Sequence, residues 1–192
     1  WEMSSTTLDN CIRYSAPEEK DLAMCFSFHH LKVDYKDGDK WKLMEPDRMA
    51  LKKLFEKWQM GMQKGHGWNA LFWCNHDQPR TVSRFGDEDK YWKESAEMLA
   101  ASIHLMRGTP YIYQGEELGM TNAHYTSISQ YRDVESLNYY KILLDQGKTE
   151  EEALTILAAR SRGNGRTPMQ WSGGANAGFT EGTPWLEVTA NY

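Results

Sequence analysis

The chain has 192 residues, of which 40% are hydrophobic, 12% aromatic and 26% charged, and its formal net charge is −5. This composition is typical of a folded globular protein and excludes an intrinsically disordered chain. The acidic balance excludes nucleic acid as a main partner, because phosphate backbones select surfaces with a basic excess. We expect no membrane partner either, since no apolar run approaches the roughly 20 residues that a spanning helix needs.

Three cysteines, Cys11, Cys25 and Cys74, are far apart in the sequence and lack a CxxC arrangement or a nearby histidine cluster. An odd number of isolated cysteines in apolar surroundings indicates reduced, buried thiols and a cytoplasmic location. No group of residues has the spacing of metal ligands, so the sequence predicts neither a metal nor another cofactor.

In chain order, the sequence first predicts a short helix that is capped by Ser5 and runs through Tyr14. Three short apolar runs follow and are interpreted as buried strands. These predicted strands are residues 22–28, 69–74 and 110–113.

Two long helices are predicted between these strands, because apolar residues recur there at helical spacing. The first, residues 47–63, starts at Pro46 and Asp47, and its apolar stripe is Leu51, Leu54, Phe55, Trp58 and Met62. The second, residues 90–106, precedes Gly108, and its stripe is Ala96, Leu99, Ile103 and Met106. Both stripes are expected to face the core.

After the third strand the pattern changes to two helices, residues 134–146 and 150–160, separated by Gly147. Thr149 and Glu152 have the spacing of a capping box for the second helix. The tail from 161 to 192 is rich in Gly, Thr, Pro and Asn and predicts a long loop, and such loops are often functional in enzymes.

Strands that alternate with helices indicate an α/β fold with a parallel sheet. Three such steps do not close a sheet, and an isolated piece would leave two strand edges unpaired. The expected parent is an eight-stranded (β/α)8 TIM barrel, in which active-site residues follow the C-terminal ends of the strands. Because the sequence opens at Trp1 without Met and closes at Tyr192 within a predicted loop, we expect a longer parent chain.

A polar cluster, Asn75-His76-Asp77, directly follows the second predicted strand. In a sugar site an ionised Asp accepts hydrogen bonds from two hydroxyls while His donates to a third. The alternative is that the cluster caps the next turn. The three residues alone leave both interpretations open.

The stretch around this cluster, WNALFWCNHDQPRTVSRFGDE, resembles the fourth signature segment of the α-amylase family of glycoside hydrolases. GTPYIYQGEELGMTN resembles the eighth-strand segment of the oligo-1,6-glucosidase-like branch, and YRDVESLN, RTPMQW and NAGFTEGTPW extend the resemblance over essentially the whole chain. It implies that residues 1–120 are β/α units from the end of the fifth strand through the eighth. Residues 121–192 are then a helical and loop appendix, and the N-terminal barrel half and the C-terminal β-domain lie outside residues 1–192.

The same resemblance implies a retaining mechanism, with two carboxylates about 5 to 5.5 Å apart at the scissile bond. Glu2-Met3 is similar to the third signature segment, so Glu2 is implied as general acid/base and Asp77 as the third carboxylate. The nucleophile belongs to the fourth strand, outside this sequence. Trp1 stands where the family usually has Gly.

Further residues are implied as sugar ligands: Asn75, His76 and Arg162. For Arg162 the alternative is loop support, because the family's usual Asp after it is Gly163 here and Gly165 replaces a small side chain. Arg166 is interpreted as holding the loop. Glu116 and Glu117 are interpreted as support after the eighth strand and not as catalytic residues.

Two stretches, EMSSTTLDNCIRYS and FSFHHLKVDYKDGDKW, resemble the trehalose-6-phosphate hydrolases of this family. They imply a phosphorylated disaccharide as substrate, with His30, Lys32 and Lys40 beside the phosphate. The alternative for the lysines is a solvated loop of mixed charge, which Asp34, Asp37 and Asp39 favour.

An oligo-1,6-glucosidase or dextran glucosidase of the same branch is the second candidate function. A barrel without catalysis that serves as a scaffold is the third, and the presence of both Glu2 and Asp77 disfavours it. The 192 residues alone are expected to be inactive.

Overall fold

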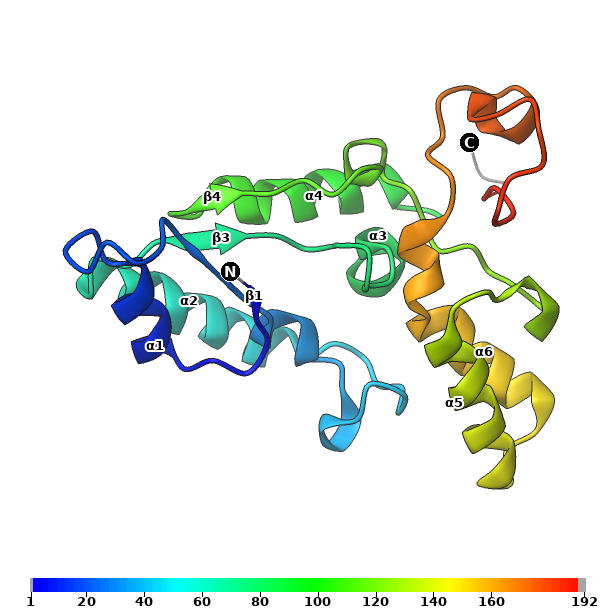
Figure 1. Cartoon of the computed structure of the whole chain (residues 1–192), viewed down its shortest axis with the longest axis horizontal. Helices are drawn as coiled ribbons and strands as arrows, with labels where there is room; N and C mark the ends of the chain where they lie inside the picture. Colours follow the sequence, from blue (N-terminus) through cyan, green and yellow to red (C-terminus); the bar gives the residue numbers. More distant parts are fainter. Residues whose placement is uncertain (1, 190–192) are drawn as a thin grey trace. The chain divides into compact units, whose positions relative to one another are not determined.

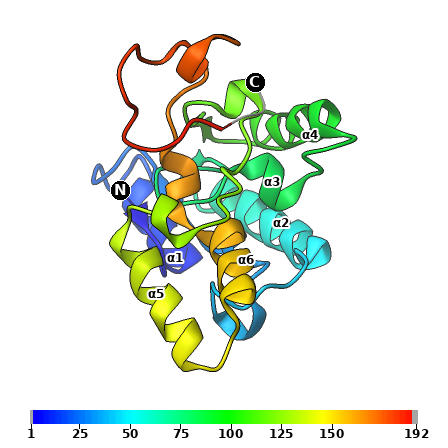
Figure 2. The same ribbon diagram turned by 90° about the vertical axis from the view of Figure 1, so that its right-hand side faces the viewer.

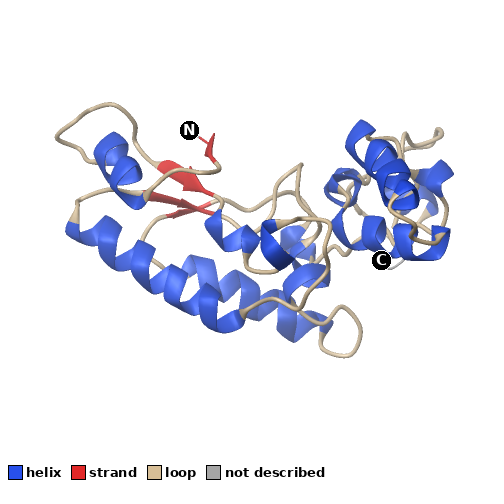
Figure 3. Ribbon diagram, turned by 90° about the horizontal axis from the view of Figure 1, so that it is seen from below, coloured by secondary structure: helices blue, strands red, loops and turns tan. Residues whose placement is uncertain are grey.

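The computed structural model describes residues 2–189 and divides the chain into two compact units. Unit 1 consists of the residues up to Trp73 together with Ala100–Tyr111, and unit 2 of Cys74–Leu99 together with the residues from Ile112 onward. Helices and loops make up nearly all of the described chain, and the strands are short (Figure 3). Among residues 2–189, no helix combines the length and the apolar character that a membrane crossing requires.

Unit 1 is built on a four-stranded sheet in which the strand order is β1-β2-β3-β4 (Figure 1). The strands are β1 (Glu2–Met3), β2 (Cys25–Ser27), β3 (Asn69–Leu71) and β4 (Thr109–Pro110). Every neighbouring pair is parallel, with Phe26 opposite both Glu2 and Ala70. The predicted parallel sheet is confirmed, and within the described residues it is open, with β1 and β4 as its edges.

The helices of unit 1 begin at polar caps. Helix α1 (Leu8–Ser15) starts after Thr7, whose side chain accepts a hydrogen bond from the Asn10 amide. The predicted cap at Ser5 is therefore wrong, because Thr7 is the residue with extended backbone at the first turn. Helix α2 (Arg48–Lys64) follows Asp47, whose Oδ1 accepts from the Ala50 amide at 2.8 Å, as the sequence predicted.

The core of unit 1 lies between α1, α2 and β2. It contains the buried side chains of Cys11, Cys25, Trp58 and Met62. Gly61 lets α1 approach, because a Cβ at this position would collide with Leu8. All three cysteines are free and buried, which confirms the prediction of reduced thiols, and burial raises the pKa of Cys11 to about 12.

Unit 2 is helical. Helices α5 (Val134–Asp145) and α6 (Glu150–Arg160) lie side by side in both views (Figures 1 and 2). The predicted capping box of α6 is present, with hydrogen bonds in both directions between Thr149 and Glu152. Helix α4 (Trp92–His104) begins in this unit, and helix α3 (Thr81–Phe85) precedes it. The sequence missed α3, since five residues are too few for a helical period to emerge.

The predicted loop after residue 160 contains two short 3₁₀ helices, Arg162–Arg166 and Ala175–Gly178. The rest of the segment as far as Thr189 has no regular structure. Trp1 and residues 190–192, which the sequence interpretation included, lie outside the described residues.

Candidate active site

The loop Asn75-His76-Asp77 comes after β3, at the start of unit 2. The Oδ1 atom of Asn75 accepts a hydrogen bond from the Asp77 amide at 2.8 Å, and its carbonyl accepts one from Gln78 at 3.2 Å. Asn75 thus shapes the turn, while the side chains of His76 and Asp77 stay 60% and 46% exposed with 3.4 Å between Nε2 and Oδ2. The turn presents an imidazole and a carboxylate together to solvent, an arrangement that can bind hydroxyl groups.

The 3₁₀ helix Arg162–Arg166 holds this loop from the other side. Arg166 donates from Nε to the His76 carbonyl at 2.7 Å and from its terminal nitrogen to Asp77 Oδ1 at 2.5 Å. A Cβ on Gly165 would lie 2.7 Å from the Gln78 carbonyl oxygen, so the two backbones are in close contact. The Tyr113 hydroxyl donates to the Gly165 carbonyl at 2.7 Å. Arg166 thus ties its own segment to the Asn75-His76-Asp77 loop, which agrees with its interpretation as a structural residue.

Arg162 lies between two acidic groups. Its Nη1 atom is 3.6 Å from Asp77 Oδ1, and its Nε atom is 3.2 Å from Asp133 Oδ1. Glu135 is further from the same Nε, at 3.8 Å. The Arg162 side chain is 28% exposed, so part of it is accessible to a ligand.

Asp133 and Glu135 were not identified as site residues from the sequence, although both lie in the YRDVESLN segment. The only local signal was that an Asp directly before a helical pattern is a helix cap. Asp133 is that cap, since it accepts from the Ser136 amide at 3.0 Å. Burial disfavours the charged carboxylate, but hydrogen bonds from Ser136, Ser161 and Arg162 outweigh it and lower the pKa of Asp133.

In unit 1, Glu2 lies in β1 with an exposed side chain. The segment after this strand is held by residues of the predicted phosphate-binding stretch. Lys32 donates from Nζ to the Ser4 carbonyl at 2.9 Å, and His29 Nε2 lies 2.6 Å from the Thr6 carbonyl. Lys32 itself is exposed.

Lys40, the second predicted phosphate ligand among the lysines of this stretch, has its Nζ 4.7 Å from the centre of the Trp41 ring. The neighbouring acidic residues have contacts of their own. Asp37 pairs with Lys42 at 3.5 Å, and Asp39 accepts a hydrogen bond from the Trp41 amide. The predicted mixed-charge loop is therefore present, and Asp37 and Asp39 both take part in its contacts.

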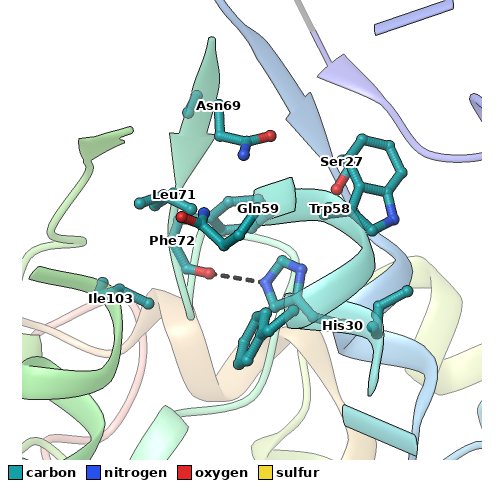
Figure 4. A pocket seen from close by; sticks show the side chains of 11 residues that line it. Ser27, His30, Trp58, Gln59, Asn69, Leu71, Phe72 and Ile103 are labelled. Atoms are coloured by element: carbon teal, nitrogen blue, oxygen red, sulfur yellow. Dashed lines mark hydrogen bonds between the residues drawn. The ribbon is translucent and has the colours of Figure 1, made fainter. Parts of the chain in front are cut away.

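His30 is buried and lines a small cavity of about 30 Å³ inside unit 1 (Figure 4). Its Nε2 is 2.7 Å from the Phe72 carbonyl, and its ring meets Phe72 edge-on at 5.0 Å. These contacts describe a core histidine, so direct contact of His30 with a phosphate stays a prediction.

Glu116 and Glu117 hold backbone. Glu116 accepts from the Tyr113 amide at 2.8 Å and from the Thr81 hydroxyl at 2.7 Å, and Glu117 accepts from the Gly115 amide at 2.8 Å. Burial raises the pKa of Glu116. The bonds agree with the interpretation of this pair as support. Among the described side chains, no group of three or more His, Cys, Asp or Glu is placed to hold a metal ion.

Comparison with known proteins identifies the family. The family model for the alpha amylase catalytic domain matches residues 1–192. The chain is 60% identical over 191 residues to a trehalose-6-phosphate hydrolase of Bacillus subtilis (strain 168) and 49% identical over 191 residues to an oligo-1,6-glucosidase of Halalkalibacterium halodurans, and both alignments include 100% of the chain.

The crystal structure of Bacillus licheniformis trehalose-6-phosphate hydrolase is 63% identical, with a TM-score of 0.97 over 99% of the chain and 34% of that structure. The chain spans about a third of its curated relatives, 34% of the length of each. Because the family model matches the whole chain, the chain belongs to the α-amylase family of glycoside hydrolases and is part of its barrel catalytic domain.

Proposed function

We propose that the complete protein hydrolyses trehalose 6-phosphate to glucose and glucose 6-phosphate. The observation that carries this proposal is the 60% identity, over the whole chain, to an enzyme named for that substrate, against 49% to an oligo-1,6-glucosidase. The second candidate function is that of an oligo-1,6-glucosidase, because the chain is 49% identical to an enzyme of that name. The free buried thiols support a cytoplasmic location as part of the proposal.

The proposed reaction retains the anomeric configuration. Glu2, as general acid, protonates the leaving glycosidic oxygen while a carboxylate nucleophile, from a segment of the complete protein outside residues 1–192, attacks the anomeric carbon. Glu2 then takes a proton from the water that releases glucose. In this proposal residues 1–120 span the fifth to eighth barrel units, residues 121–192 are their appendix, and residues 1–192 alone are inactive.

Asp77 is proposed as the third carboxylate, which accepts hydrogen bonds from sugar hydroxyls as the ring distorts. His76 and Arg162 are its proposed partners in sugar binding, and both stand within 3.6 Å of the Asp77 carboxylate. The contact of Asn75 with the Asp77 amide supports a role in shaping this site, beside the predicted sugar contact.

Lys32 and Lys40 are proposed as the phosphate ligands. The Lys32 ammonium group has three N–H donors, of which the Ser4 carbonyl accepts one. Its exposed position next to the segment after β1 supports a contact with a substrate bound beside Glu2. A doubly charged phosphate gains strong hydrogen bonds from such ammonium groups.

The test is the double variant Lys32→Ala/Lys40→Ala in the complete protein. We expect kcat/KM for trehalose 6-phosphate to fall by roughly tenfold to a hundredfold, because charge-assisted hydrogen bonds are lost. The kcat/KM for unphosphorylated trehalose should stay within about twofold, since no phosphate is present to lose contacts. Lys36→Ala is the matched control, as Lys36 is an exposed lysine of the same stretch. An equal loss of kcat/KM for both substrates would show that the two lysines do not recognise the phosphate.

A further inference from the structure

We propose that Asp133 is a positioning residue of the sugar site, which holds Arg162 in the orientation that leaves Asp77 able to bind substrate. The inference rests on the proposed function for the identity of the reaction. Asp133, Arg162 and Asp77 all lie in unit 2 and contact one another in sequence.

The Asp133 carboxylate is fixed from several directions. Its side chain is only 5% exposed. Oδ1 accepts from the Ser136 amide at 3.0 Å and from Arg162 Nε at 3.2 Å, while Oδ2 accepts from the Ser161 hydroxyl at 3.2 Å. Ser136 in turn donates to Ser161 at 2.7 Å. A carboxylate held by so many donors is a rigid anchor for a guanidinium group.

Arg162 therefore has a negative partner on each side. Asp133 is the nearer one, at 3.2 Å, and Asp77 is at 3.6 Å. Asp77 Oδ1 already accepts a hydrogen bond from Arg166. If Asp133 lost its charge, Asp77 at 3.6 Å and Glu135 at 3.8 Å would remain as acidic partners of Arg162. The balance of attraction on the guanidinium would then shift toward Asp77, the nearer of the two. The Asp77 oxygens would then be occupied by two arginines and less able to accept bonds from sugar hydroxyls.

A substitution at Gly163 can distinguish the positioning of Arg162 by Asp133 from a contribution of Asp133 to folding stability. A Cβ at this position would lie 3.7 Å from Asp133 Oδ2 and 3.1 Å from the Ser161 hydroxyl oxygen. A carboxylate introduced at position 163 would thus lie beside the Asp133 carboxylate. In a chain whose Asp133 is neutral, it would return a negative charge to the same side of Arg162.

The experiment uses the complete protein with Asp133→Asn. Asn caps helices as well as Asp, so the variant keeps the α5 cap and removes the charge. We expect kcat/KM to fall by roughly tenfold to a hundredfold, the cost of a misplaced group in an active site. Adding Gly163→Asp should recover more than half of this loss on a logarithmic scale, which a purely structural role of Asp133 would not produce.

Asp47→Asn is the matched control. Asp47 caps α2 in the same way, through the Ala50 amide, and it is exposed, so its variant should keep wild-type kcat/KM. Asp133→Ser, which also preserves a cap, is the second test variant. The proposal is overturned if Asp133→Asn stays within about twofold of the wild type, if Gly163→Asp gives no recovery, or if neither Asp133 variant folds.

Both trehalose 6-phosphate and isomaltose should be used as substrates. A wild-type preference for isomaltose would contradict the proposed function. The role of Asp133 would still be measured by the ratio of kcat/KM between variant and wild type on isomaltose. If kcat/KM of Asp133→Asn on the preferred substrate equals that of the wild type, the role of Asp133 is contradicted and the proposed function is not.

Discussion

Arg166 binds one loop through two different nitrogens, at the His76 carbonyl and at the Asp77 carboxylate. Arg166→Lys keeps the positive charge but cannot span both acceptors, because an ammonium group is a single point donor on a flexible stem. We expect kcat/KM of the complete protein to fall by roughly tenfold or more. Arg13→Lys is the control, since Arg13 is exposed on α1 and should tolerate the change. Wild-type activity of Arg166→Lys would show that the loop is held without the paired contact.

At this scale the sequence predicts individual residues but not the contacts between them. His76 and Asp77 are predicted as site residues by the resemblance of their segment to the α-amylase family, since the three polar residues alone leave the turn-cap alternative open. Arg166 is interpreted as holding its own loop, and its contacts with His76 and Asp77 were not predicted. The contact of Asp133 with Arg162 was not predicted, because two helices separate these residues in the sequence. Periodicity and capping patterns report neighbours along the chain, and a pair brought together by folding leaves no such pattern.

Helix α6 depends on its first turn for much of its local stability. Thr149 and Glu152 exchange hydrogen bonds at 2.8 and 3.2 Å, which satisfies two amides that a helix start leaves unpaired. Thr149→Ala should cost about 1 kcal/mol of local stability, and faster hydrogen exchange of the α6 amides would measure it. Thr155→Ala is the control on the same helix, since its hydroxyl bonds only within the helix, to Glu151. Equal exchange in both variants would contradict a role for the cap.

Long helices were predicted more accurately than strands. Helices α2, α5 and α6 agree with the prediction to within about a residue at each end, because a long apolar period and a polar cap specify the same boundary. Strand β4 has two residues, Thr109–Pro110, where four were predicted from 110 to 113. An apolar run indicates that a segment is buried, but its length does not give the length of the strand. The strand extends only as far as the backbone pairs with β3.

At the scale of the whole molecule, the described sheet is open at β1 and β4, whereas a barrel pairs every strand. The sequence predicted this incompleteness from the small number of β/α steps. Patterns of elements along the chain carry no information on how compact units are placed.

The complete protein is proposed to act on a phosphorylated disaccharide. The most direct measurement is kcat/KM of the purified complete protein for trehalose 6-phosphate and for isomaltose under the same conditions. We expect trehalose 6-phosphate to be preferred by roughly a hundredfold or more, since a site built for a charged group loses its paired contacts with a neutral substrate. Equal rates, or a preference for isomaltose, would contradict it.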